Sequence, residues 1–178
     1  MSCNCRTIVG ALGRKIKIIE WSFTADTTAF ITGDALQSSY ATFNDVFDFE
    51  NGNGRVIEFR VEQRNATTVT KKAISAIIFH TQPVSAIVVI NAAEAVSAID
   101  FVKIAGIASV VTGDYVDTTT GTEVLTTAIK TANSDDLPII WNNDTSNKRA
   151  TWIKLIMGEG ATFTASTLVH VTLQIEVF

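Results

Sequence analysis

The chain has 178 residues, of which 47% are hydrophobic and only 18% are charged, and its formal net charge is −4. This length suits one domain with a core that needs no disulfide or metal, and the apolar composition excludes a disordered chain. The negative charge argues against electrostatic binding to nucleic acid or to anionic membranes, so we expect neither as a partner.

Residues 1–13 are predicted to form an N-terminal arm, followed by a single domain that spans 14–178. The arm carries the apolar side chains of Ile8, Val9 and Leu12 but has no strand or helix period of its own. Such a segment becomes ordered only when it docks, because fixing each residue costs about 1–2 kcal/mol. We therefore expect the arm to contact a neighbouring subunit.

Alternation of apolar and polar residues predicts strands along most of the domain. In the stretch 55–62, the apolar residues Ile57, Phe59 and Val61 alternate with charged residues, and 169–177 alternates as clearly. The Asn-Gly-Asn-Gly turn that precedes 55–62 is expected to join it to a strand at 46–49 as a hairpin. Further strands are predicted at 15–23, 75–79, 84–90, 101–111, 123–130, 137–141 and 151–157.

The uncharged stretch 73–93 is about as long as a membrane-spanning helix, but His-Thr-Gln-Pro lies at its centre. Its β-branched and aromatic residues favour two buried strands joined by a turn. Helix features occur at 91–100, where Asn91 can act as N-cap and Glu94 can complete a capping box. The predicted fold is all-β: an antiparallel two-sheet β-sandwich, jelly-roll-like, with one short helical crossover.

Signature motifs of common enzymes are missing from the sequence, and we expect no enzyme and no catalytic residue. His80 and His170 lie far apart in the chain and have no local carboxylate partner. No cofactor and no metal are expected either, because Cys3 and Cys5 have no second Cys or His cluster to complete a zinc site. Acidic loop residues match no defined calcium loop and are interpreted as solvated turns: Asp114, Asp117, Glu123, Asp135 and Asp136.

Several predicted strands are apolar on both faces, although the strands of small sandwiches normally leave one face to water. The stretch 84–90 is apolar on both faces and 101–111 is nearly so, and in 151–157 Trp152 and Ile156 lie with Lys154 opposite the expected core face. A symmetric homo-oligomer, with a trimer preferred, would cover these surfaces. The candidate interface residues are Ile8, Val9, Leu12, Val84, Val88, Ile90, Trp152 and Ile156.

The stretch 23–35 reads Phe-Thr-Ala-Asp-Thr-Thr-Ala-Phe-Ile-Thr-Gly-Asp-Ala. It resembles a motif of small tailed-bacteriophage structural proteins, in which an Ala-Asp-Thr-Thr-Ala-aromatic run precedes a Gly-Asp pair. The resemblance covers 23–178 and continues through the Asn-Gly-Asn-Gly-Arg-Val-Ile turn, the stretches 77–83 and 90–93, and the last strand. Ile90 departs from it, because those proteins have Asp there. We interpret the Gly-Asp pair as structural: glycine for the turn, aspartate as acceptor for backbone amides.

The resemblance implies a virion structural protein of the kind that includes sandwich-fold decoration or cement proteins, often trimers. Such a protein would stabilise the shell by bridging major-capsid subunits, and it would lie on the capsid surface after synthesis in the bacterial cytoplasm. The alternatives are a tail, fibre or baseplate protein that contacts host glycans, or a carbohydrate-binding β-sandwich module. In these, Trp21, Trp141 and Trp152 would form a sugar-stacking platform, although core packing or a subunit contact is the favoured interpretation of the tryptophans.

Overall fold

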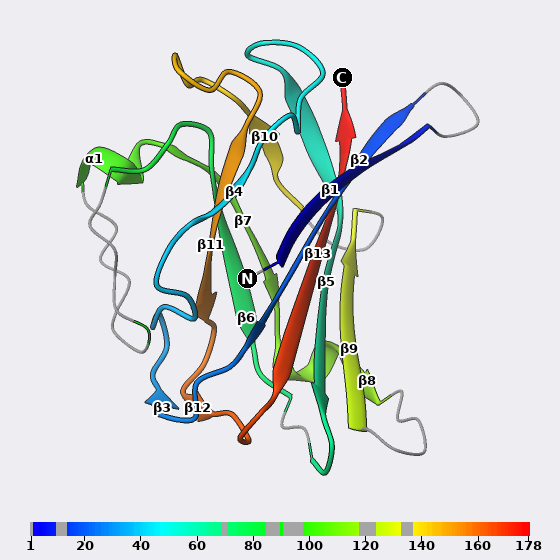
Figure 1. The fold of residues 1–178 in the computed structure, drawn as a ribbon, viewed down its shortest axis with the longest axis vertical. Coiled ribbons are helices and arrows are strands. Elements are labelled where there is room, and N and C mark those ends of the chain that lie inside the picture. The colour runs from blue at the N-terminus through cyan, green and yellow to red at the C-terminus, as the bar shows by residue number, and fades with distance from the viewer. Residues whose placement is uncertain are drawn as a thin grey trace.

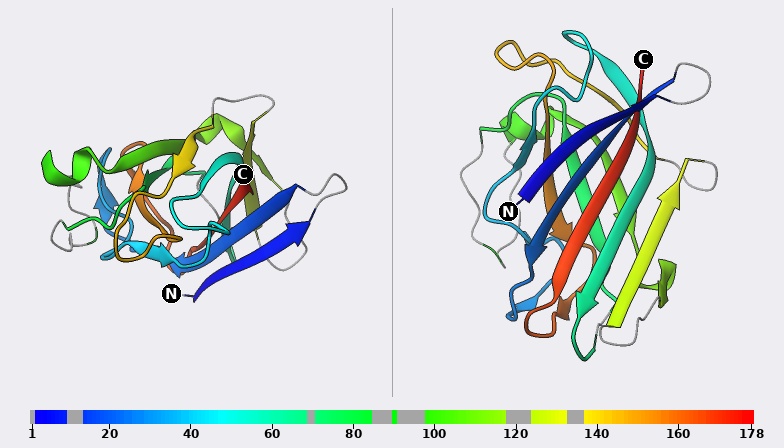
Figure 2. Two further views of the ribbon diagram at one scale, coloured as in Figure 1. Left: turned by 90° about the horizontal axis from the view of Figure 1, so that it is seen from above. Right: turned by 45° about the vertical axis from the view of Figure 1, so that its right-hand side comes forward.

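Strands dominate the part of the chain that the computed structural model describes, which comprises residues 2–9, 14–68, 71–84, 90, 98–117, 124–132 and 137–178. The larger sheet has seven strands in the order β1-β2-β13-β5-β9-β8, with β10 also paired to β5. Figure 2 shows β2, β13, β5 and β9 side by side. The strand bounds are β1 Ser2–Val9, β2 Lys15–Thr24, β5 Asn53–Asn65, β8 Tyr115–Asp117, β9 Val124–Thr131, β10 Ile139–Trp141 and β13 Leu168–Val177.

The smaller sheet has four strands in the order β4-β11-β6-β7 and packs against the larger one (Figure 1). Its strands are β4 Ala41–Phe43, β6 Ile74–Phe79, β7 Ile104–Val110 and β11 Thr151–Met157. A two-stranded sheet pairs β3 Ala29–Phe30 with β12 Ala161–Thr162, and the described helices are α1 Ala98–Phe101 and the 3₁₀ turn η1 Thr112–Asp114. The pairings are antiparallel, so the predicted all-β sandwich is confirmed.

The only described part of the predicted helix at 91–100 is its C-terminal end in α1, because 91–97 lie outside the described residues. Among the described residues, no helix is both long and apolar enough to cross a membrane.

The core lies between the two sheets and uses the inward positions of the alternating strands. In β13, Val169, Val171, Leu173 and Ile175 are fully buried, as their period of two predicts. β13 lies in the middle of the larger sheet, between β2 and β5, and its inward side chains belong to the main core. The alternation of this segment therefore predicted both the strand and its buried face.

In β5, the sequence prediction of the inward face is partly wrong. Phe59 and Val61 are buried in the core as predicted, but Val56 takes the inward position that the alternation assigned to Ile57. The cause is a register shift between Gln174 and Ile175 of the neighbouring β13, which changes the face of the residues that precede Phe59.

The predicted hairpin between 46–49 and 55–62 does not form. Residues 46–49 are not a strand, and β5 pairs with β13, β9 and β10 instead. Phe47 donates its backbone N–H to the Arg149 carbonyl oxygen at 3.1 Å, which ties this segment to the loop before β11. Its apolar side chains, those of Val46 and Phe47, are nevertheless buried in the core. The apolar residues of 46–49 therefore predicted correctly that Val46 and Phe47 are buried, but not whether the segment pairs as a strand.

The N-terminal segment differs from the expected arm, because residues 2–9 form the edge strand β1 and pair with β2 along their whole length. β2 pairs with the backbone groups on one side of this segment, so the strand forms without a period of two in its own side chains. Ile8 and Val9 are exposed, and Leu12 lies outside the described residues. Cys5 packs against the core, and burial raises the pKa of its thiol, which makes it less reactive.

The chain itself covers much of the apolar outer face of the smaller sheet. Trp152 and Phe79 form a second buried cluster there with Ile77 and Ala150. The Tyr40 ring meets Phe79 edge-on at 5.3 Å, and Ile156 packs partly buried against the same cluster. The expectation that Trp152 contacts another subunit is therefore corrected, because the side chain is only 2% exposed within its own chain.

The predicted strand at 84–90 is mostly outside the described residues, which include neither Val88 nor the rest of 85–89. Of its ends, Val84 is exposed and lies outside any strand. Ile90 is partly buried and packs against the main core, so its side chain is not an open surface.

Candidate functional site

The helix α1 lies at one side of the molecule (Figure 1), and several apolar side chains in and near it are exposed. We call this group the apolar tip and define it as Val84, Ile99, Phe101 and Val102, which are 68%, 65%, 68% and 73% exposed. Val84 belongs to it because its backbone N–H donates to the Asp100 side chain in α1 at 2.9 Å. Scattered apolar residues are normal on a surface, so the grouping of these four around one short helix makes the apolar tip a candidate interaction site.

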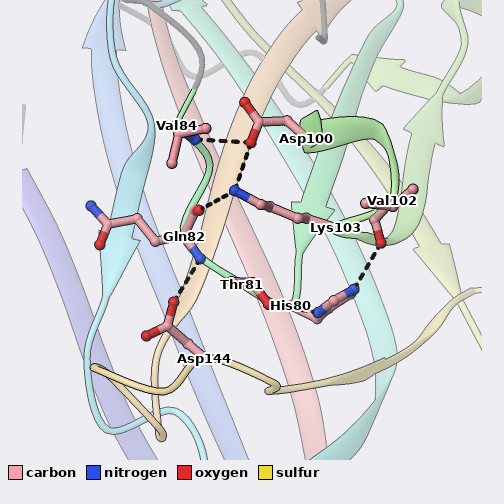
Figure 3. A network of polar contacts seen from close by, with 8 residues as sticks. All are labelled: His80, Thr81, Gln82, Val84, Asp100, Val102, Lys103 and Asp144. Atoms are coloured by element: carbon pink, nitrogen blue, oxygen red, sulfur yellow. Dashed lines mark hydrogen bonds and ion pairs between the residues drawn. The ribbon is translucent and has the colours of Figure 1, made fainter. Parts of the chain in front are cut away.

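A buried ion pair fixes the backbone beneath the apolar tip (Figure 3). Asp100 is fully buried, and its Oδ1 atom lies 2.9 Å from the Nζ atom of Lys103. Lys103 Nζ also donates to the Gln82 carbonyl oxygen at 3.0 Å. The Asp100 carboxylate and the Lys103 ammonium thus hold the segment that ends at Val84 against α1. Their opposite charges compensate each other beneath the apolar tip.

His80 holds the other end of the same segment. Its Nε2 atom donates to the Val102 carbonyl oxygen at 3.1 Å, and its backbone N–H donates to the Lys103 carbonyl oxygen at 2.9 Å. With the proton on Nε2, Nδ1 of the neutral ring accepts the Thr81 hydroxyl at 2.9 Å. His80 is therefore a structural residue with both ring nitrogens engaged.

Asp144 connects this network to the loop after β10. Its carboxylate accepts the backbone N–H groups of Gln82 at 3.0 Å, Ser146 at 2.8 Å and Asn147 at 2.7 Å. Burial alone would raise the pKa of Asp144, but these three backbone donors and the nearby Lys103 outweigh it and hold the pKa below its ordinary value.

This lowered pKa predicts a specific loss of stability in acid. The unfolded chain binds the Asp144 proton more readily than the folded chain, so the stabilisation is complete above about pH 5 and disappears as the pH falls through the folded-state pKa. Urea unfolding at pH 7 and pH 3 measures it. We expect Asp144→Asn to lose less stability between these pH values than the unchanged protein, and equal losses would contradict the prediction.

Trp141 is the exposed one of the three tryptophans, with 41% of its surface accessible. Its ring stacks on the His80 ring with 5.0 Å between centroids and 18° between planes. Trp21 and Trp152 are buried in the two apolar clusters, Trp21 against Phe43. The structure therefore excludes a sugar platform built from all three tryptophans and leaves Trp141 as the accessible aromatic surface.

The remaining sequence candidates are dispersed over the fold. His170 lies on the outer face of β13, in a shallow hollow with Glu62 and Arg64. Asp114 pairs with Lys130 at 2.9 Å and Asp117 pairs with Lys71 at 3.1 Å. Glu123, Asp135 and Asp136 lie outside the described residues, and the described ones hold no cluster of three or more metal-ligating side chains.

The Gly-Asp pair is structural, as the sequence indicated. Gly33 has φ of +89°, a conformation that favours glycine, and its N–H donates to the Met157 carbonyl oxygen at 2.8 Å. The Asp34 carboxylate accepts the backbone N–H of Ile31 at 2.7 Å. Both residues therefore shape the turn after β3.

Sequence reasoning found one member of the apolar tip, Val84, and missed the other three. Ile99 belonged to a predicted helix, and Phe101 and Val102 began a predicted strand with apolar residues on nearly both faces, but none of the three was named as a candidate interface residue. A usable signal was the Asp100 and Lys103 pair, because two opposite charges three residues apart interrupt an apolar run and can pair with each other.

The fold and these residues define an antiparallel β-sandwich with an exposed apolar tip and an adjacent aromatic surface. No family model and no curated protein matches the chain. Among solved structures, it is similar to the crystal structure of a protein described as a candidate sugar-binding protein from Bacteroides thetaiotaomicron. The two share 10% identity with a TM-score of 0.31, and the alignment covers 98% of this chain and 81% of that one. Similarity at this level carries no argument about function.

Proposed function

We propose that the chain is a structural protein of a tailed-phage virion, and in particular a capsid decoration or cement protein that bridges major-capsid subunits. The resemblance of 23–35 to such proteins supports the virion, with a place on the capsid surface after synthesis in the host cytoplasm. The observation that carries the proposal is the apolar tip, because a binding surface of this kind suits a protein partner.

The apolar tip is suited to bind without rearrangement. The hydrogen bonds of Asp100, Lys103 and His80 hold its backbone in place before a partner arrives. Binding therefore avoids much of the entropy loss that ordering a loop would add. Asp100 is fully buried and Lys103 mostly so, which leaves an uncharged surface for an apolar patch on the capsid protein.

Burial of apolar surface would be the source of the binding energy. A contact that removes about 300 Å² of apolar area from water contributes about 7 kcal/mol. Association itself costs about 4 to 15 kcal/mol, so one such contact is weak. A shell offers the same contact many times, and a protein that touches two capsid subunits at once gains from their effective concentration. The proposed mechanism therefore depends on many copies of the contact over the shell and on each protein touching two capsid subunits.

The proposal includes a homo-oligomer, with a trimer as the preferred state. β1 pairs with β2 on one side, and no described strand pairs with its other side. Open strand edges are generally protected in proteins, since their free N–H and C=O groups recruit other strands. Ile8 and Val9 are exposed on this strand. We propose that the outer edge of β1 is the contact between copies, in place of the extended arm expected from the sequence.

Binding to undecorated phage heads tests the capsid proposal. We expect Phe101→Ser to reduce the occupancy of the heads at least tenfold at a protein concentration that half-saturates the unchanged chain, because it replaces a central apolar contact by a hydroxyl. Phe49→Ser is the matched control, since Phe49 is also exposed but lies outside the apolar tip. Occupancy is measured by sedimenting the heads, and light scattering of the free protein gives its oligomeric state.

Equal occupancy for Phe101→Ser and Phe49→Ser would show that the apolar tip is not the binding surface. If no version binds heads or protects them from heat, the capsid proposal is wrong. The tail, fibre or baseplate alternative, and the carbohydrate-binding module, would then be favoured by the exposed ring of Trp141.

A further inference from the structure

The Trp141 ring is a flat aromatic surface whose orientation is set before any ligand binds. One face stacks on His80, and His80 is itself held by Thr81, Val102 and Lys103. The ring is nevertheless 41% exposed. An aromatic side chain that is fixed on one face and open to solvent can bind a flat partner without loss of side-chain entropy.

Two exposed asparagines lie close to Trp141, one across the sheet and one along the chain. Asn53 lies directly opposite Trp141 in the antiparallel pair of β5 and β10, so the two side chains share one face of the sheet. Asn143 follows two residues after Trp141, and its backbone N–H donates to the His80 carbonyl oxygen at 2.7 Å. Both asparagines are exposed, and neither carboxamide makes a hydrogen bond with the described residues. Each therefore has a free donor and a free acceptor.

This combination fits the chemistry of a sugar ring. The C–H groups of a pyranose form an apolar face that packs on indole, while its hydroxyl groups both donate and accept hydrogen bonds, as carboxamides do. The side chains of Trp141, Asn53 and Asn143 carry no charge. The nearby Arg55, two residues along β5 from Asn53, has its guanidinium 3.2 Å from the Glu176 carboxylate, which compensates its charge. A neutral sugar therefore suits the site better than an acidic one.

We propose that Trp141, Asn53 and Asn143 bind one ring of a neutral oligosaccharide. This inference does not rest on the proposed capsid role, because the apolar tip and the Trp141 ring use different side chains on either side of His80.

Nuclear magnetic resonance of the full ¹⁵N-labelled chain tests the proposal through its three indole N–H signals. The chain is titrated with maltohexaose, cellohexaose, laminarihexaose and mannohexaose. We expect the Trp141 signal, assigned from its loss in Trp141→Phe, to shift with at least one of these probes. The signals of buried Trp21 and Trp152 serve as internal controls and should not move.

Substitutions then separate sugar binding from general adhesion. Trp141→Ala should abolish binding, and Asn53→Ala or Asn143→Ala should each raise the dissociation constant about fivefold, the effect of one lost hydrogen bond. Ile139→Ala is the matched control, since Ile139 is exposed on the same face of β10 but offers no hydrogen bond.

The proposal is overturned if none of the four probes shifts the Trp141 signal, or if Ile139→Ala weakens binding as much as Asn143→Ala. It is also overturned if Trp141→Ala reduces the occupancy of phage heads but leaves saccharide binding unchanged, because Trp141 would then be a protein contact. Phe101→Ser should leave saccharide binding intact, so failure of the capsid proposal and failure of this one give different results.

Discussion

Replacing Trp152 with alanine is expected to lower the free energy of unfolding by about 3–5 kcal/mol. The indole is almost fully buried on the outer face of the smaller sheet, where it packs with Ile77, Phe79 and Ala150. Tyr40 closes this cluster from the segment before β4, with its ring edge-on to Phe79. Because Ile77 and Phe79 lie on β6, which is hydrogen-bonded to β11, their backbones cannot move into the space that the indole leaves.

Urea unfolding at several protein concentrations measures this loss and separates two interpretations of Trp152. A residue buried within its own chain gives the same loss at every concentration, whereas a residue at a subunit contact gives a loss that depends on association. Trp141→Ala makes the identical change at an exposed position and should lower stability by only about 1 kcal/mol, from the lost stack on His80. A concentration-dependent loss for Trp152→Ala would restore the interface interpretation that the sequence suggested.

Asp100→Ala is expected to lower the free energy of unfolding by about 3–5 kcal/mol, the range for one partner removed from a buried ion pair. Without the carboxylate, the largely buried ammonium of Lys103 loses its counter-charge, and the backbone N–H of Val84 loses its acceptor. Hydrogen exchange at the Val84 amide should accelerate in this variant, which links the loss to the segment beneath the apolar tip.

Asp117→Ala is the matched control, because Asp117 also forms an ion pair but on the surface, with Lys71. Exposed pairs contribute about 0 to 1 kcal/mol, so this variant should stay within about 1 kcal/mol of the unchanged protein. Similar losses for Asp100→Ala and Asp117→Ala would mean that the buried network does not hold the apolar tip.

Period-two patterns predicted the strands well. The predicted strand at 151–157 coincides with β11, and the predictions at 15–23, 123–130 and 169–177 differ from β2, β9 and β13 by one residue at either end. In β13 one face lies on the core, so burial imposes the alternation on the sequence itself, whereas β11 is buried on both faces and is mostly apolar on both. The prediction failed at 46–49, where apolar residues are buried in a loop, and at 2–9, where a strand forms because β2 supplies its hydrogen bonds.

The candidate sites could be predicted much less well, because the residue type of an apolar side chain does not determine whether it is exposed. Trp152 and Trp141 are the same residue type, each at a predicted strand, yet one is 2% and the other 41% exposed. What separates them is the Tyr40 side chain, which comes from a distant part of the sequence and packs against the cluster that contains Trp152.

The sequence by itself determined the all-β class, most strand positions and the structural role of the Gly-Asp turn, because each depends on local period or local backbone conformation. Only the tertiary structure decided which apolar residues remain at the surface and that Asp100, Lys103 and His80 hold the apolar tip in place. It also placed Asn53 beside Trp141, although the two are distant in the chain. These features arise from contacts between separate segments, which a local pattern does not encode.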